Sequence, residues 1–333
     1  MSCIEIKNLS KSFGKQKIIQ NLSFNIAENS RVAIVGESGV GKTTLLRMIA
    51  GLESYDSGEI IYQKKNKTIG MIFQDGGLFE HALVKDNIIF GLKKLGYSKE
   101  KINKDLFDIS KKLHIEHLLN RYPISLSSGE KQRVGIARAL IRKVDILLLD
   151  EPFSNLDIKL TYELEKELLE IQESYGMTMI MVTHNIDEAF FFAQKIGILK
   201  DGQLLEYCST ENLLKHPTHL ETMTFLFPNI NQLDGKIENN KLWINDMQIG
   251  DTTLENQQVK VLIKVESIVL NTGNLIGKIT EKRILKNGFN YQLKINDVIL
   301  NCCSEYDINE KEIHFAIKQF YVFNQTGLNV YDG

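Results

Sequence analysis

Apolar and polar positions follow two different patterns along the chain, and the change comes near residue 225. Before it, runs of mostly apolar residues predict buried β-strands at 31–35, 145–149 and 179–182. Apolar side chains at helical spacing predict helices at 44–50, 134–141 and 161–171. Strands that alternate with helices indicate an α/β core in which a mainly parallel sheet is covered on both faces.

Beyond that point the chain contains short strand-like pieces separated by turn residues. The pieces lie at 241–244, 259–265, 277–280, 291–295 and 298–300, with turns expected at 239–240, 271–273, 287–288 and 296–297. This spacing favours a small all-β barrel or sandwich. Pro217 and Pro228 bracket the exit from the first part, so we predict two domains, 1–228 and 229–333.

Composition narrows the possible functions. The 333 residues carry a formal net charge of −2 and are 43% hydrophobic and 25% charged, which excludes a disordered chain and argues against a nucleic-acid partner. The four cysteines match neither a disulfide framework nor a zinc site. Residues 1–7 lack the pattern of a secretory signal, and no apolar run approaches the ~20 residues that span a bilayer. We therefore expect a cytoplasmic protein that serves a membrane only through a partner.

A phosphate-binding pattern directly follows the first predicted buried strand. Residues 36–43, Gly-Glu-Ser-Gly-Val-Gly-Lys-Thr, fit G-x-x-x-x-G-K-[ST]. Backbone N–H groups of such a loop point at a polyphosphate, while Lys42 would contact β- and γ-phosphate oxygens and the Thr43 hydroxyl would bind Mg²⁺. The alternative is a glycine-rich turn with no ligand, yet the pattern arises by chance only roughly once in a hundred chains of this length.

Two adjacent acids end the most hydrophobic predicted strand. Ligands of open α/β sheets lie beyond the carboxyl ends of the strands, where Asp150 and Glu151 would emerge. Asp150 would hold the Mg²⁺ shell and Glu151 would polarise the water that attacks the γ-phosphate. Alone, the pair could simply begin a solvated loop, but beside the phosphate-binding pattern we favour the catalytic interpretation.

A capping pattern precedes the predicted helix that contains residues 134–141. Ser127 is followed three residues later by Glu130, which predicts a capping box. The start of such a helix, with exposed N–H groups and small side chains, is also an anion site.

Together these motifs resemble those of the ATP-binding subunits of ABC transporters. They occur in the same order as in that family and extend through nearly the whole first domain. Residues 36–43 resemble the Walker A loop, 126–130 the signature loop, 146–151 the Walker B strand with its catalytic glutamate, and 154–157 the D-loop. Gln74 is similar to the Q-loop glutamine, His184 to the switch histidine, and Phe13 is placed like the aromatic residue that stacks on adenine.

The resemblance implies a P-loop NTPase fold with a helical subdomain, and a head-to-tail dimer that holds ATP between two copies. Glu151, His184 and Gln74 would be catalytic, and Thr43, Gln74 and Asp150 would bind the metal. Nucleotide contacts would come from Phe13, Gly36, Glu37, Ser38, Gly39, Val40, Gly41, Lys42, Thr43, Thr44, Ser127, Ser128, Gly129, Glu130 and Asp157. The family usually has Gly where Ser128 stands and Gln where Glu130 stands, so we expect reduced rather than lost activity.

The resemblance extends to importers. Residues 78–88 are similar to the segment that contacts the permease, and the β-rich tail resembles a small accessory domain that regulates and helps to dimerise importer ATPases. Residues 121–123, residues 73–79 and the short tail are most similar to the ferric-iron group, with sulfate, polyamine, molybdate and sugar importers as alternatives. Such a subunit would lie at the cytoplasmic side of the membrane and serve a substrate-binding protein indirectly. A non-transport ABC ATPase, or a regulatory module that has lost hydrolysis, stays as a rival interpretation.

Overall fold

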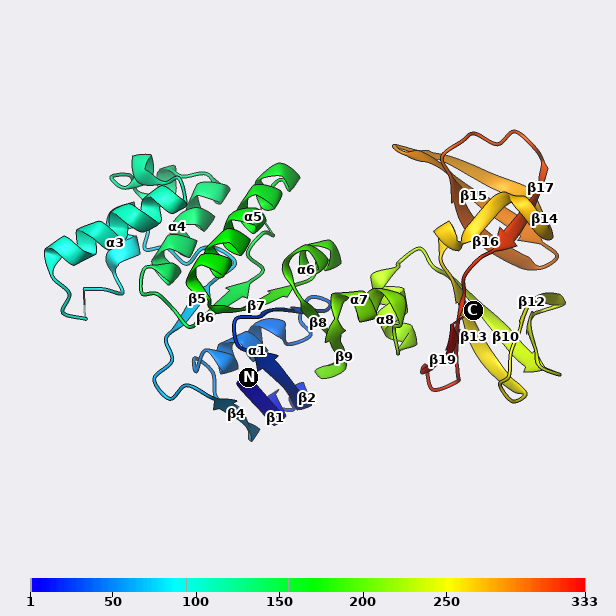
Figure 1. Ribbon diagram of the computed structural model, residues 1–333, viewed down its shortest axis with the longest axis horizontal. Coiled ribbons are helices and arrows are strands. Elements are labelled where there is room, and N and C mark those ends of the chain that lie inside the picture. Colours follow the sequence, from blue (N-terminus) through cyan, green and yellow to red (C-terminus); the bar gives the residue numbers. More distant parts are fainter. Residues whose placement is uncertain (1, 94, 155, 333) are drawn as a thin grey trace. The chain divides into compact units, whose positions relative to one another are not determined.

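The computed structural model describes residues 2–93, 95–154 and 156–332 and divides the chain between Leu213 and Leu214 into two compact units (Figure 1). The first unit contains two sheets. A three-stranded antiparallel sheet has the order β2-β1-β4 and consists of β1 (Ser2–Phe13), β2 (Gln16–Ala27) and β4 (Ser57–Tyr62). A six-stranded sheet has the order β5-β6-β7-β3-β8-β9, and only β9 runs antiparallel to its neighbour. Its strands are β3 (Arg31–Val35), β5 (Ile69–Ile72), β6 (Ile146–Asp150), β7 (Thr178–Thr183), β8 (Lys195–Lys200) and β9 (Gln203–Ser209).

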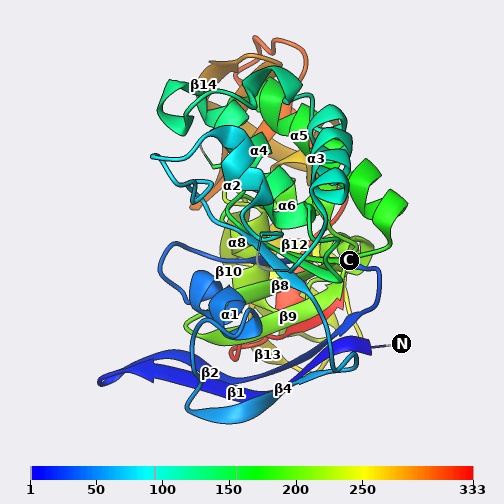
Figure 2. The same ribbon diagram turned by 90° about the vertical axis from the view of Figure 1, so that its left-hand side faces the viewer.

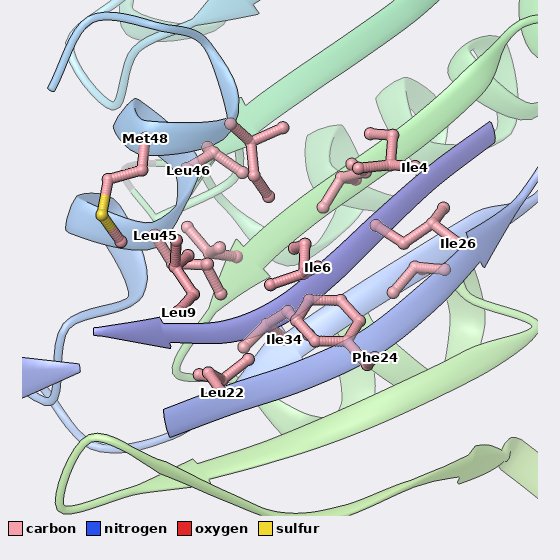
Figure 3. Close-up of a cluster of buried hydrophobic side chains, with 14 of the residues drawn as sticks. Ile4, Ile6, Leu9, Leu22, Phe24, Ile26, Ile34, Leu45, Leu46 and Met48 are labelled. Atoms are coloured by element: carbon pink, nitrogen blue, oxygen red, sulfur yellow. The ribbon is translucent and has the colours of Figure 1, made fainter. Parts of the chain in front are cut away.

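The two sheets share one hydrophobic core with α1 (Lys42–Ile49). Leu45, Leu46 and Met48 of this helix pack with apolar side chains of β1, β2 and β3 (Figure 3). Figure 2 shows α1 beside the β1–β2–β4 sheet. Every residue of β6 and β7 is buried, as expected for strands covered on both faces. The helix that follows the glycine-rich loop is therefore anchored along its apolar face, which fixes the loop itself.

The remaining elements of the first unit are mainly helical. They are α2 (Val84–Ile89), α3 (Lys99–Lys112), the 3₁₀ turns η1 (Glu116–Leu118) and η2 (Pro123–Ser125), α4 (Ser128–Leu140), α5 (Ile158–Tyr175) and α6 (Ile186–Phe192). Helices α2, α3 and α4 pack on one another. The predicted helices overlap α1, α4 and α5, and Leu164, Leu168 and Ile171 face the core as their spacing required. Among the described residues, none of the helices combines the length and the apolar character that a membrane-spanning helix needs.

The second unit is built mainly from two antiparallel sheets that share one large hydrophobic cluster. One has the order β12-β11-β10-β13-β18-β19 and the other β16-β15-β14-β17. Buried side chains of both sheets, such as Val261 and Leu293, belong to the same cluster. The strands are β10 (Asn231–Glu238), β11 (Lys241–Ile244), β12 (Met247–Asp251), β13 (Gln257–Ile263), β14 (Ile268–Leu285), β15 (Gly288–Ile295), β16 (Val298–Ser304), β17 (Glu312–Ile317), β18 (Tyr321–Phe323) and β19 (Asn329–Asp332), with the turn η3 (Val265–Ser267).

One predicted turn of this unit is wrong. Residues 271–273 do not separate two strands but lie inside β14, where the pairing with β17 shifts register between Leu270 and Leu275. Asn271 and Gly273 have φ values of 60° and 80°. The turn-forming residues at 271–273 therefore mark an irregularity within a strand.

Two short helices, α7 (Thr210–Lys215) and α8 (Leu220–Leu226), connect the β-strands of the two parts. The sequence placed the domain boundary after residue 228, whereas the contacts divide the chain after Leu213. The difference has a clear cause, because Met223 of α8 is buried against Leu262, Tyr321 and Phe323 of the second unit.

Candidate active site

The glycine-rich loop joins β3 to α1 with a backbone that only small residues permit. Gly41 caps α1 with φ 108°, in the left-handed region. A Cβ atom at Gly36 would lie 2.3 Å from the carbonyl oxygen of Leu199, so this position also excludes a side chain. Residues 36–44 thus form a tight loop that ends at a helix N-terminus, the arrangement that presents N–H groups to an anion.

Lys42 is the buried cation of this loop. Only 4% of the residue is exposed, and its Nζ donates hydrogen bonds to the carbonyl oxygens of Gly36 (2.8 Å) and Glu37 (2.9 Å). Burial lowers the pKa of the ammonium, and the nearby carboxylate of Glu151 opposes this shift. A buried ammonium that gains an anionic partner recovers part of its desolvation cost, so the loop favours a phosphate.

Thr43 and Asp150 bring two oxygen atoms together at the end of β6. The hydroxyl Oγ1 of Thr43 donates to Oδ1 of Asp150 at 2.8 Å. Asp150 is only 6% exposed, and burial raises the pKa of its carboxyl group. Hydroxyl and carboxylate oxygens are the hard donors that Mg²⁺ prefers, and a cation here would compensate the buried charge of Asp150. The donor set therefore fits Mg²⁺.

Glu151 is the point on which the other predicted catalytic residues converge. Its Oε2 lies 3.2 Å from Nδ1 of His184 and 3.5 Å from Nε2 of Gln74, and its Oε1 lies 3.8 Å from Nζ of Lys42. The backbone of Glu151 has φ 45°, unusual for a residue with a side chain, and its N–H donates to the carbonyl of Val182. A strained residue fixed in this way places its carboxylate beyond the strand end.

The predicted signature loop begins α4 as a complete capping box. Ser127 Oγ accepts from the N–H of Glu130 (3.3 Å), and Glu130 Oε2 accepts from both the N–H (2.8 Å) and the hydroxyl (3.0 Å) of Ser127. These hydrogen bonds, first of all the one from the Ser127 backbone, lower the pKa of Glu130. Glu130 therefore carries its negative charge at the helix tip.

The start of α4 packs closely on the start of α5. A Cβ atom at Gly129 would lie 2.2 Å from a methyl carbon of Leu160, so glycine is required there. Asp157 caps α5 by accepting from the N–H of Leu160 at 3.0 Å. Asn155, part of the predicted D-loop, lies outside the described residues.

The structure thus separates the predicted residues into three places. Lys42, Thr43, Gln74, Asp150, Glu151 and His184 form one cluster. Among the described residues no hydrogen bond or ion pair joins this cluster to residues 127–130 or to Asp157. Phe13 lies at the end of β1, half exposed, with the ammonium of Lys11 4.8 Å from its ring centroid.

Sequence reasoning missed one residue beside this cluster. Glu188, in the first turn of α6, accepts hydrogen bonds from the side chains of Thr183 and Asn185, the two neighbours of His184. An Asn followed three residues later by Glu indicates the start of a helix, and residues 185–188 contain this pattern.

Comparison with known proteins assigns the chain to a family. The family model described as "ABC transporter" matches residues 19–154. The Fe(3+) ions import ATP-binding protein FbpC of Fusobacterium nucleatum is 35% identical over 281 residues, which cover 80% of this chain and 76% of that protein. The chain belongs to the ABC transporter family. It is an ABC ATPase, and it is similar to the ATP-binding proteins of import systems.

Two further comparisons extend the assignment. The maltose/maltodextrin import ATP-binding protein MalK of Escherichia coli O6:H1 is 34% identical over 343 residues, covering 98% of this chain and 90% of that protein. The solved dimeric structure of the ATP-binding cassette MJ0796, in a post-hydrolysis state bound to ADP and Pi, aligns with a TM-score of 0.57. It is 30% identical and covers 62% of this chain and 98% of that one. The predicted ABC ATPase fold is confirmed.

Proposed function

We propose that this ABC ATPase is the subunit that energises import through a membrane permease, and that two copies clamp ATP head to tail. The observation that carries the proposal is the convergence of Lys42, Gln74 and His184 on the carboxylate of Glu151. The solved relative in its dimeric state supports the dimer, and the import ATP-binding relatives support the permease partner.

Each side chain of the cluster has a role that its position suits. Lys42 binds β- and γ-phosphate oxygens, with the N–H groups of residues 36–44 around them. Glu151 accepts a proton from the attacking water while the water oxygen bonds to the γ-phosphorus and the bond to the bridging oxygen breaks. His184 and Gln74 hold the carboxylate and the γ-phosphate in line. Thr43, Asp150 and Gln74 would hold Mg²⁺, which neutralises phosphate charge when bound.

The second copy completes the site. Among the described residues no hydrogen bond or ion pair joins residues 127–130 to the Lys42 cluster, yet their helix tip offers backbone N–H groups to an anion, and the Ser127 hydroxyl would join them by turning away from Glu130. A head-to-tail pair places this tip on the γ-phosphate bound by the other copy, with Asp157 beside it. Phe13 stacks on the adenine ring. In this arrangement ATP joins the two copies and hydrolysis releases them.

The test compares ATP turnover in the wild-type chain and in Glu151→Gln, with the permease reconstituted in proteoliposomes. Glutamine keeps the size of the side chain but loses the base, so hydrolysis falls by orders of magnitude while ATP still binds. Near-normal hydrolysis in Glu151→Gln would remove Glu151 from this role. Stimulation of the wild-type rate by the permease, together with recovery of the protein in membrane fractions, tests its place at the cytoplasmic face.

For the cargo we propose ferric iron. The iron-import relative is 35% identical and the maltose-import relative 34%, so identity alone separates them little. Residues 73–79 and 121–123 support iron. Uptake of labelled Fe³⁺, sulfate, maltose, molybdate and spermidine is measured in cells that carry the wild-type chain or only Lys42→Ala. A defect confined to Fe³⁺ supports the assignment, and a defect confined to another cargo replaces it with that one.

A further inference from the structure

A closed set of hydrogen bonds surrounds the backbone of His184. Thr183 Oγ1 donates to Glu188 Oε2 at 2.6 Å, and Asn185 Nδ2 donates to Glu188 Oε1 at 3.2 Å. The N–H of Asn185 donates to Thr183 Oγ1 at 3.0 Å, which closes the ring. The carboxylate of Glu188 therefore uses both oxygens to hold the residues immediately before and after His184.

The ring is tied to the sheet at one end. Thr183 is the last residue of β7, is 1% exposed, and pairs with Val35 of β3. At the other end Asn185 caps α6 by accepting from the N–H of Asp187 at 3.0 Å. The His184 side chain takes no part in the ring. It is half exposed, and its Nδ1 faces Glu151.

We propose that Glu188 is a positioning residue for His184: its carboxylate fixes the turn at 183–185 and thereby holds the imidazole against Glu151. This inference rests on the roles of Glu151 and His184 in the function proposed above. A carboxylate suits this position because both partners, the Thr183 hydroxyl and the Asn185 amide, donate to it. An amide at position 188 would keep an oxygen for Asn185 but would turn its NH₂ group toward the Thr183 hydroxyl, which would then have to accept instead of donate, so the charge-assisted hydrogen bond from Thr183 would be replaced by a weaker neutral one.

The charged groups around Glu188 come from three elements. His184 lies on the same turn, Glu151 follows β6, and Glu165 lies on α5. Burial raises the pKa of Glu188, while its hydrogen bonds with Thr183 and Asn185 act in the opposite direction. The hydrogen bonds thus favour the ionised form that the ring uses.

If Glu188 only stabilised α6, its substitution would change the stability of the protein but not its catalysis. Steady-state ATPase kinetics of Glu188→Gln therefore distinguish this structural role from the positioning role. We expect kcat to fall roughly 10- to 100-fold, because small misplacements of catalytic groups cost that much, with the KM for ATP changed less than about threefold. The matched control is Asp187→Asn, which removes the same charge from the adjacent exposed position and should leave both constants unchanged.

A second pair of variants guards against misfolding of Glu188→Gln. Thr183→Val removes the hydroxyl that Glu188 holds at nearly constant shape and should lower kcat, whereas Thr183→Ser keeps the hydroxyl and should restore it. Imidazole ¹⁵N spectra add a direct signature: the His184 resonance, assigned by its loss in His184→Ala, should shift in Glu188→Gln and not in Asp187→Asn.

The double variant separates failure of this inference from failure of the proposed function. If Glu188 acts through His184, adding Glu188→Gln to His184→Ala costs little more than His184→Ala alone. Wild-type kcat in both Glu188→Gln and Thr183→Val, while His184→Ala is inactive, overturns the inference alone. Wild-type kcat in His184→Ala overturns the role of His184 and the inference with it.

Discussion

The hydroxyl of Thr43 donates a hydrogen bond to Asp150 Oδ1 over 2.8 Å, across 107 positions of sequence. Thr43 is the second residue of α1 and Asp150 ends β6, so the hydrogen bond joins the end of the glycine-rich loop to the strand that Glu151 directly follows. Both elements lie within the first unit, whose buried core includes residues of each. The parts of the site to which we assign phosphate binding and water activation are therefore built on one packed frame.

Lys42→Ala should abolish tight ATP binding. The ammonium supplies charge-assisted hydrogen bonds worth about 1.5–3 kcal/mol each, so its loss raises the ATP Kd by roughly 10- to 100-fold or more. Calorimetric titration of ATP measures the change. Lys104→Ala, an exposed lysine of α3, is the control and should bind normally. An unchanged titration of Lys42→Ala would contradict the assignment of residues 36–44.

Phe13→Ala should weaken binding of ATP but not of inorganic triphosphate. Stacking of a base on an aromatic ring is worth about 1–3 kcal/mol, which corresponds to a roughly 5- to 100-fold rise in the ATP Kd. Phe13→Trp should preserve affinity. The half-exposed Phe107 of α3 provides the control variant, Phe107→Ala. Equal losses for ATP and triphosphate would indicate a structural effect rather than adenine stacking.

Glu130→Gln should strengthen the ATP-bound dimer severalfold. Its ionised carboxylate lies at the helix tip that we propose to contact the γ-phosphate of the other copy, so the charge should oppose closure of the dimer. Glutamine can still complete the capping box, and the helix start should survive. Sedimentation analysis in the Glu151→Gln background measures the dimer dissociation constant. A weaker dimer would show that Glu130 supports closure instead.

Glu165→Gln should stabilise the protein above pH 7. Burial, helped by the charge of Glu188, raises the pKa of Glu165 to about 7, and its Oε1 has no hydrogen-bond partner among the described residues. The folded state then binds a proton that the unfolded state has released, so stability falls as the pH rises from about 4.5 to 7.

Removing this ionisation should raise the free energy of unfolding at pH 8 by about 1–2 kcal/mol and flatten its pH dependence. Denaturant unfolding at pH 5.5 and pH 8 measures both effects. The control is Glu170→Gln on the exposed side of the same helix, which should change little. An equal gain at both pH values would contradict the ionisation account.

The sequence predicted the parts of the structure that local chemistry determines. Strand β3 occurs at the predicted residues, and the capping box at Ser127 and Glu130 forms as its spacing required. The gathering of Lys42, Gln74 and His184 around Glu151 is different in kind. The position of Glu151 at a strand end predicted that it would lie near the phosphate-binding loop of Lys42, whereas Gln74 and His184 were placed there only by the order of motifs shared with a known family.

The features that could not be predicted from the sequence depend on contacts between residues that are distant in the chain. Helix α8 belongs to the second unit because Met223 is buried against Tyr321. The residues near Met223 in the sequence give no indication of this distant contact. Residues 271–273 were predicted as a turn but lie at an irregularity inside a long strand. The residue types that favour positive φ values occur at bulges as well as at turns, so the sequence pattern does not distinguish the two. Glu188 was overlooked because its proposed role depends on the hydrogen-bond donors that surround it in the fold, the side chains of Thr183 and Asn185.

The most direct test of the account is the mass of Glu151→Gln in solution with Mg²⁺ and ATP, measured by light scattering after gel filtration. The account predicts a species of twice the 38.1 kDa of one chain, which is lost when Lys42→Ala is added or when ADP replaces ATP. A protein that stays at the mass of one chain with ATP, even in the presence of its permease, would contradict the claim that two copies share the nucleotide.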